Sequence, residues 1–325
     1  MCKLWLTKFR GKTMSLSSTT HRKFSLRLLL NRFNLNYRRR ENLWFVILVF
    51  PNLLLLAIWT FWPFIHSLYL SFTDWNLLTP TWNIVGFENY LKLLRTPLFW
   101  QVTRNSMLFG IGTVAVGLPL AMGLALLLNQ PLYLRSLWRF IFFSPHITTT
   151  AAMALVWKAM YDPDFGIFNT LFAFFGGKFP DVLGDTRYVL PALAVVAIWK
   201  SLGFSTVVFL AALQGVDTTL KEAAAIDGAN NRQIFRYVVF PSITPITYFL
   251  LVIGIVGAIR TFDVVSVMTG GGPANASNMF VYQIYTEAFT NLRMGVASAL
   301  AGIMLLIILV ITAVQTRLRE RWVNY

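Results

Sequence analysis

The fold is decided by the stretch Ser106-Met-Leu-Phe-Gly-Ile-Gly-Thr-Val-Ala-Val-Gly-Leu-Pro-Leu-Ala-Met-Gly-Leu-Ala-Leu-Leu-Leu128, which holds no charged side chain. A run of about 17 to 25 apolar residues is long enough to cross the hydrocarbon core of a bilayer as a helix. A helix suits that medium because it satisfies its own backbone hydrogen-bonding groups. The stretch therefore predicts a membrane-spanning helix.

Five further runs have a similar character, and they lie on both sides of the first. They are Leu43 to Phe64, Phe140 to Val156, Tyr188 to Leu213, Ile243 to Ile259 and Met294 to Val314. Together the six runs predict an all-α integral membrane protein with six transmembrane helices. The run from Phe165 to Phe175 is too short to span, and its five phenylalanines predict a helix that lies at the membrane interface.

The composition of the whole chain agrees with lipid as its solvent. Of the 325 residues 56% are apolar and 13% are charged, with a mean hydropathy of +0.60. An ordinary soluble domain has about twice that charged share, so a soluble globule is excluded. Cys2 is the single cysteine, so an internal disulfide and a cysteine-based metal site are excluded too.

The net charge of +15 predicts the orientation of the chain rather than a nucleic-acid partner. With the N-terminus in the cytoplasm, the inner segments hold 19 Lys and Arg residues and the outer segments hold 8. Eleven of the 19 lie in the first 42 residues, which we expect to touch anionic membrane lipid. We therefore expect both termini on the cytoplasmic side, with a basic arm (1–42), a six-helix domain (43–316) and a cytoplasmic tail (317–325).

The cytoplasmic loop between the fourth and fifth runs, residues 214–241, has the pattern of a helical elbow. Asp217 or Thr219 can cap a helix rich in alanine, and Gly228 can supply the positive φ that ends it. A second short helix is predicted from Asn230 to about Val239, ending at Pro241. Two roles are open for Glu222, which can contact a basic partner or close a capping box with Thr219.

This loop resembles the hallmark of the inner-membrane permease subunits of binding-protein-dependent ABC importers. The hallmark reads Glu-Ala-Ala, three residues, Gly, nine residues, then Ile-x-Leu-Pro. Here it stands as Glu222-Ala223-Ala224, Gly228 and Val238-x-Phe240-Pro241, with two conservative departures.

Other segments are similar to one subfamily, the MalF-type permeases of carbohydrate importers. They are Ser67 to Asp74, Val85 to Tyr90, Asp162 to Gly166, Ile226 to Ala229 and Thr269 to Pro273. The resemblance implies a type I ABC importer transmembrane domain that moves a sugar or glycoside inward by alternating access. Its implied partners are a second, MalG-type permease, a cytoplasmic ATPase dimer and an extracytoplasmic solute-binding protein.

The resemblance also implies which residues carry the coupling to ATP hydrolysis. ATP and Mg would bind to the ATPase, and this chain would hold no cofactor, metal or catalytic residue of its own. The elbow would be the coupling helix, and its implied contact residues are Glu222, Ala223, Ala224, Asp227, Gly228 and Pro241.

Polar residues inside or beside the spans, with the tryptophan and the helix-loosening glycine next to them, are the candidates for a solute cavity, because polar groups are costly in lipid and aromatic rings stack on carbohydrates. Those of the fourth and fifth runs are Trp199, Lys200, Gly203, Thr206, Arg260, Thr261 and Asp263. Two other roles are open: Lys200 can snorkel or pair across the subunit interface, and the glycines can serve helix packing alone. Pro145 and His146 in the third run predict a kink and a cap rather than contact with solute.

The solute itself stays open at this stage. The same architecture suits a non-sugar solute such as glycerol 3-phosphate. An integral membrane enzyme and an ATP-independent carrier are the other classes, and the enzyme is disfavoured because no acid–base constellation is visible in the spans.

Overall fold

The computed structural model describes residues 37–131 and 133–320 of the chain. They fall into two compact units that meet between Trp62 and Pro63. Within the described residues the regular elements are helical, and the one pairing of extended backbone is an isolated bridge between Thr73 and Ile84. The all-α class predicted from the apolar runs is thus confirmed.

The first unit contributes one long helix. It consists of α2 (Tyr37–Leu56), a π-helical turn η1 (Ala57–Phe61) and the start of α3 (Trp62–Leu70). The candidate membrane segment Glu41–Leu70 includes residues of both units and extends the predicted first span toward both termini.

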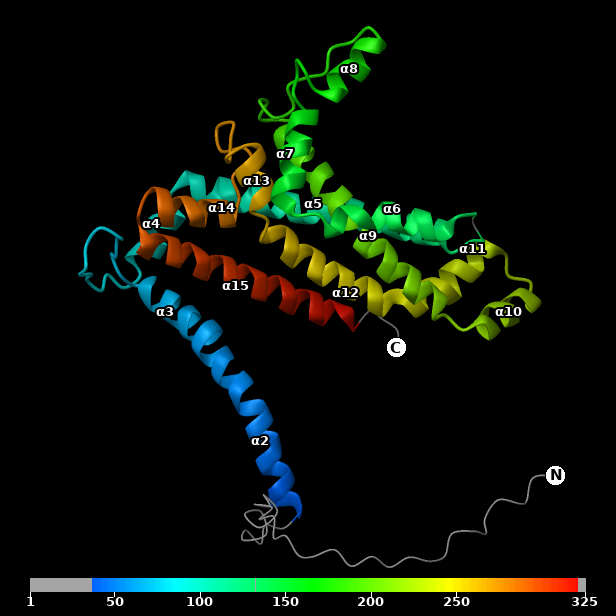
Figure 1. Cartoon of the computed structure of the whole chain (residues 1–325), viewed down its shortest axis with the longest axis horizontal. Coiled ribbons are helices and arrows are strands. Elements are labelled where there is room, and N and C mark those ends of the chain that lie inside the picture. The colour runs from blue at the N-terminus through cyan, green and yellow to red at the C-terminus, as the bar shows by residue number, and fades with distance from the viewer. Residues whose placement is uncertain (1–36, 132, 321–325) are drawn as a thin grey trace, which may run out of the picture. The chain divides into compact units, whose positions relative to one another are not determined.

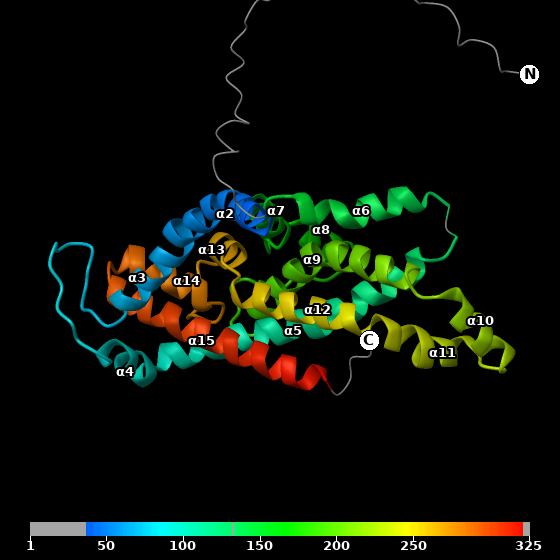
Figure 2. The same cartoon turned by 90° about the horizontal axis from the view of Figure 1, so that it is seen from below.

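The second unit is organised around four long helices. Figures 1 and 2 show α5, α9, α12 and α15 running along the same direction, with shorter helices grouped at their ends. The elements of this unit are α4 (Glu88–Arg95), α5 (Pro97–Leu128), α6 (Arg135–Ile147), α7 (Thr150–Met160), α8 (Ile167–Phe174), α9 (Val189–Gln214), α10 (Thr218–Ile226), α11 (Asn231–Ile234), η2 (Phe235–Val239), α12 (Phe240–Ile259), α13 (Asp263–Met268), α14 (Phe280–Tyr285), η3 (Thr286–Thr290) and α15 (Met294–Arg319).

Apolar contacts show the relative direction of α5 and α9. Near their carboxyl ends α5 and α9 share a core cluster that includes Leu128 and Leu213. Near their amino ends Phe109 of α5 packs with Leu193 of α9. The two helices therefore run parallel, and the chain leaves α9 at the end that carries the elbow.

The span predicted from Phe140 to Val156 is wrong as a single helix. It is a broken pair, α6 and α7, bent by 100°. Thr148 and Thr149 between them are extended, and Pro145 lies inside the last turn of α6. A proline that removes a backbone donor and β-branched residues that favour extended backbone explain a break here. Within the described residues five helices are long and apolar enough to span, or six if the pair counts as one.

The second span also differs from its expected limits. It was predicted to begin at Ser106, but α5 begins at Pro97, directly after the extended Thr96. Proline suits the first turn of a helix, because the missing N–H has no partner there in any case. As a result Arg104, which precedes the predicted span, lies on the helix itself.

Candidate functional site

The elbow between α9 and α12 is built by local hydrogen bonds. The Asp217 side chain accepts from the Thr219 backbone N–H at 2.8 Å and caps α10. At the other end the Ala229 and Gly228 N–H groups donate to carbonyls of the last turn of α10, at 3.0 and 3.1 Å. Gly228 has φ of +85°, as this kind of helix end requires. The predicted helix start and stop are therefore both confirmed.

The second helix of the elbow starts with a reciprocal cap. The Asn230 side chain accepts from the Gln233 N–H at 3.0 Å, and the Gln233 side chain accepts from the Asn230 N–H at 2.8 Å. The capping-box interpretation of Thr219 and Glu222 is wrong, because Asp217 occupies the cap position and Thr219 lies in the first turn of α10.

Glu222 is left available for a partner outside the chain. Its side chain is exposed and makes no ion pair or hydrogen bond with any residue of the described segments. Ala223 and Asp227 are exposed as well, and Ala224 is half-buried. Ile226, one turn after Glu222, is 86% exposed, which is unusual for a large apolar side chain in an ordered helix. Ile226 was not predicted as a contact residue, although it lies four residues after Glu222 and therefore on the same face of the helix.

The prediction that the second helix of the elbow ends at Pro241 is wrong. The helix runs without interruption from Asn231 to Ile259, and Pro241 lies inside it, half-buried. The turn just before it, η2, is a π-helix in which the Phe240 N–H donates to the Phe235 carbonyl. Proline has no backbone N–H to donate to the helix. The helix accommodates Pro241 because the preceding π-turn is wider and because Pro241 lies near the start of α12. The elbow is thereby joined directly to the fifth span.

A cavity of about 480 Å³ lies between α5, α9 and α12. Four of the predicted solute residues line it, namely Lys200, Arg260, Thr261 and Asp263. Its other polar side chains are Thr113, His146, Thr150, Ser201 and Ser205, and its aromatic rings are Phe109, Phe204 and Phe262. Rings beside hydroxyl and charged groups are what a small hydroxylated solute requires of a binding site.

One charged group of the cavity, Lys200, contacts the break between α6 and α7. The Lys200 ammonium group donates to the Thr148 carbonyl at 2.6 Å and interacts electrostatically with Asp263. His146 stacks on Phe204 with the ring centroids 5.1 Å apart. The sequence predicted only a kink and a cap for His146, whereas the structure places its ring on the cavity wall.

The other three predicted solute residues do not line this cavity. Trp199 packs edge-on against Trp157, with the centroids 5.5 Å apart. Gly203 lies so close to α6 that an added Cβ would overlap the Phe142 carbonyl. Thr206 is buried, and its hydroxyl has no hydrogen-bond partner within the described residues. Sequence spacing alone did not separate the packing face of α9 from its cavity face, because polar residues occur on both: Lys200 and Ser201 line the cavity, whereas Thr206 is buried outside it.

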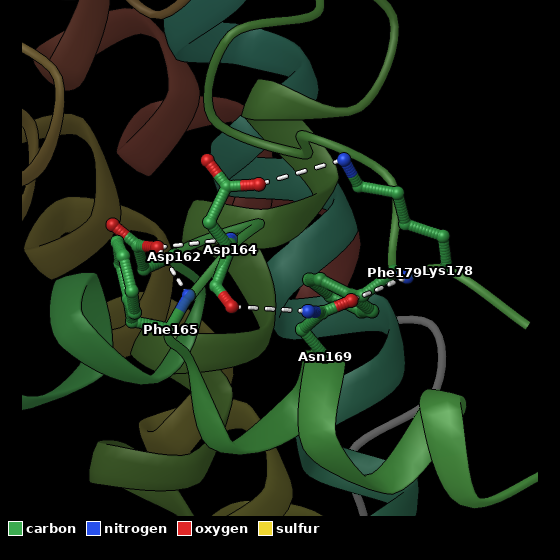
Figure 3. A network of polar contacts seen from close by, with 6 residues as sticks. All are labelled: Asp162, Asp164, Phe165, Asn169, Lys178 and Phe179. Carbon is green, nitrogen blue, oxygen red and sulfur yellow. Dashed lines mark hydrogen bonds and ion pairs between the residues drawn. The ribbon is translucent and has the colours of Figure 1, made fainter.

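The segment that contains α8 is held by a separate polar network (Figure 3). The Asp162 carboxylate accepts from the N–H groups of Asp164 and Phe165, at 3.0 and 2.8 Å. The Asn169 side chain accepts from the Phe179 N–H at 3.1 Å, and Lys178 pairs with Asp164 at 3.4 Å. The backbone N–H groups of Phe165 and Asp164 hold the pKa of Asp162 below its ordinary value of 3.8. A helix was predicted here and is confirmed as α8, which Figure 1 shows projecting away from the long helices together with α7.

Comparison with protein families gives one match over nearly the whole chain. Residues 40–324 match the model of the binding-protein-dependent transport system inner membrane component. A probable ABC transporter permease of Pyrococcus horikoshii is 32% identical over 277 residues, covering 84% of this chain and 95% of the relative. The sn-glycerol-3-phosphate transport system permease UgpA of Agrobacterium fabrum is 31% identical over 280 residues, covering 86% and 95%.

Solved structures share the fold. A chain of a bacterial ABC transporter involved in the import of the acidic polysaccharide alginate matches with a TM-score of 0.77 at 22% identity. The match covers 92% of this chain and all of the other. A second alginate transporter structure, in complex with a periplasmic protein that holds an alginate pentasaccharide, matches with a TM-score of 0.76 at 22% identity, covering 87% and 96%.

Proposed function

The chain belongs to the family of inner membrane components of binding-protein-dependent transport systems, and on that basis we propose how its own residues take part in transport. It is a multi-pass inner-membrane permease, a transport subunit rather than an enzyme. We propose that the elbow docks on a cytoplasmic ATPase dimer, which binds ATP and Mg and hydrolyses ATP. A second, MalG-type permease would complete the pathway, with both termini of this chain in the cytoplasm.

One observation carries this proposal: the elbow and the cavity are connected by a single helix. The helix Asn231–Ile259 starts at the elbow and ends at Arg260, which lines the cavity. A movement imposed on the elbow by the ATPase would therefore reach the cavity directly. An extracytoplasmic solute-binding protein would deliver solute to the opposite end of the helices, and alternating access would release it inward.

The coupling role is tested by reconstituting the chain with its permease and ATPase partners. Glu222→Ala should lower solute-stimulated ATP hydrolysis about tenfold or more, because a charged contact in a protein interface contributes roughly 1.5 kcal/mol or more. Glu320→Ala is the matched control, since it removes another exposed glutamate on the tail side of α15. Unchanged stimulation in the Glu222→Ala complex would refute the coupling role.

A second pair of variants tests the turn of the elbow. Gly228→Pro should abolish stimulation, because proline fixes φ near −65° and the turn needs a positive value. Gly228→Asn should retain most of it, because asparagine tolerates left-handed backbone. Equal activity in the two variants would show that the turn is not needed.

For the solute we propose a sugar or glycoside, on the strength of the aromatic rings and hydroxyl groups that line the cavity. A phosphorylated polyol such as glycerol 3-phosphate is the second candidate, and one observation favours it. The cavity is lined by two basic side chains, Lys200 and Arg260, against the single carboxyl group of Asp263.

Uptake measurements separate the two candidates. Proteoliposomes with the complete importer should take up labelled neutral sugars but not glycerol 3-phosphate if the first candidate is right. Arg260→Gln then distinguishes them again, because it should weaken uptake of a phosphate ester about tenfold and of a neutral sugar far less. Uptake of neither solute would reject both.

A further inference from the structure

A second cavity, of about 1,000 Å³, opens between α5 and α9 at the end of the helices away from the elbow. We call it the α5–α9 groove. It is lined by residues near the amino ends of both helices and shares Phe109 with the solute cavity. Its polar members lie at one end, and they are Gln101, Arg104, Asn105, Thr186 and Arg187.

Two arginines at the mouth of the groove have no partner of their own. Arg104 lies on α5 and Arg187 lies just before α9, and both are exposed. Neither guanidinium group makes an ion pair or a hydrogen bond with the described residues, and no carboxylate lines the groove. Two unpaired guanidinium groups at a shared opening form a site for an anion, and phosphate oxygens suit their geometry.

The rest of the groove is apolar, and its wall on α5, measured from Arg104, is about as long as one lipid leaflet is thick. Along α5 the groove residues recur every four positions, at Arg104, Leu108, Gly112 and Val116. At 1.5 Å per residue they extend over about 18 Å. Half of the hydrocarbon core of a bilayer is about 15 Å thick. The opposite wall, on α9, is formed by Leu190, Pro191, Ala194, Val195 and Ile198.

A tryptophan marks the level of the headgroups. Trp100 lies one turn before Arg104, lines the groove and is 57% exposed. Tryptophan is enriched where the hydrocarbon core meets the headgroups. The arginines are therefore placed at headgroup depth and the apolar wall at acyl-chain depth.

We propose that the α5–α9 groove binds an anionic phospholipid of the leaflet opposite the elbow. Its phosphate lies between Arg104 and Arg187, and one acyl chain follows the wall formed by Leu108, Gly112 and Val116. A helix from a partner subunit is the competing occupant, but an apolar helix would cover the two arginines without neutralising them, which is costly in lipid. A phospholipid satisfies the charge and the apolar wall together.

Gly112 allows the groove to be filled without disturbing the fold. A Cβ added there meets no atom within 4 Å. Gly112→Leu should therefore fold normally and obstruct the acyl chain. Gly123→Leu is the matched control, because it lies on the same helix, also has open space around its Cβ, and lies outside the groove.

The test is native mass spectrometry of the complete importer with phosphatidylglycerol or phosphatidylcholine. The wild type should retain one phosphatidylglycerol more tightly than phosphatidylcholine. The double variant Arg104→Gln, Arg187→Gln should bind phosphatidylglycerol about 30-fold more weakly, since each arginine near an anionic lipid contributes a factor of about five. Arg95→Gln, an exposed arginine on α4 outside the groove, should leave retention unchanged.

A photoreactive amino acid at position 108 identifies the occupant directly. Cross-linking to lipid supports the proposal, and cross-linking to a partner subunit overturns it. Equal retention of the two lipids, or equal retention by the wild type, the double arginine variant and Gly112→Leu, overturns it as well.

Discussion

The ammonium group of Lys200 donates a hydrogen bond of 2.6 Å to the backbone carbonyl of Thr148. Lys200 belongs to α9, and Thr148 is the first residue of the break between α6 and α7. Because Lys200 also lines the solute cavity, the same side chain joins the cavity wall to the bend.

Lys200→Met is therefore expected to impair transport more than stability. It removes the charge that faces Asp263 and leaves the Thr148 carbonyl without this donor, while the methionine still fills the space. Solute uptake in proteoliposomes should fall about tenfold, with assembly unchanged. Lys158→Met is the control, because Lys158 also reaches a backbone carbonyl, that of Val267, but lies outside the cavity. Equal loss in both variants would contradict the role assigned to Lys200.

Ile226→Ser should weaken the association with the ATPase without destabilising the permease. Ile226 is 86% exposed, so the chain alone loses little when the side chain is shortened. Burying a large apolar side chain in an interface contributes about 1.5–3 kcal/mol, which corresponds to a loss of affinity of tenfold or more. Ile84→Ser, at a position 72% exposed outside the elbow, is the control for both measurements. Unchanged affinity in titrations with the isolated ATPase would remove Ile226 from the docking surface.

Gly203→Ala should lower the thermal stability of the purified protein. The added Cβ would overlap the backbone of Phe142 and force α6 away from α9. Such overpacking costs about 1–3 kcal/mol. Gly112→Ala, with no atom within 4 Å of the added Cβ, should leave the melting temperature nearly unchanged. A melting temperature for Gly203→Ala equal to that of the wild type would show that α6 can shift at no cost.

Acid should loosen the turn that precedes α8. The pKa of Asp162 is lowered by the backbone donors of Phe165 and Asp164, so the carboxylate stabilises the turn above the ordinary value of 3.8. That contribution is lost as the pH falls through the lowered pKa. Hydrogen exchange at the Asp164 and Phe165 amides, corrected for intrinsic rates, should lose protection below pH of about 4. In Asp162→Asn this pH dependence should disappear, and its persistence would assign the effect to another group.

Most of the fold follows from features that are local in the sequence. The uncharged run that ends at Leu128 predicts most of α5. The capping Asp217 and the terminating Gly228 predict α10. The break at Thr148 was not predicted, because the apolar run continues through it and hides two extended residues. The passage of Pro241 through a continuous helix was missed for a similar reason, since π-helical turns have no clear sequence signature.

The solute cavity was predicted in part. Arg260, Thr261 and Asp263 were found because they end a span, where polar residues stand out. Trp199 was assigned to the cavity as a ring that could stack on a sugar, and Gly203 and Thr206 because they follow Lys200 along the chain. Proximity along a helix does not fix which face a residue occupies, because successive residues point about 100° apart. Only the packing of α6 and α7 against α9 separates these positions.

The continuous helix from Asn231 to Ile259 has a mechanical consequence. Its 29 residues form a rod about 43 Å long, with the elbow at one end and the cavity at the other. If the helix rotates as a rigid body about the point where it is packed, its two ends move in opposite directions. The position of that point along the helix determines the ratio of the two displacements. The buried residues Ile243 and Leu250, which pack with residues of α5 and α9, lie at this rotation point. If these packing contacts lay at another position along the helix, a given displacement of the elbow would produce a different displacement of the cavity wall.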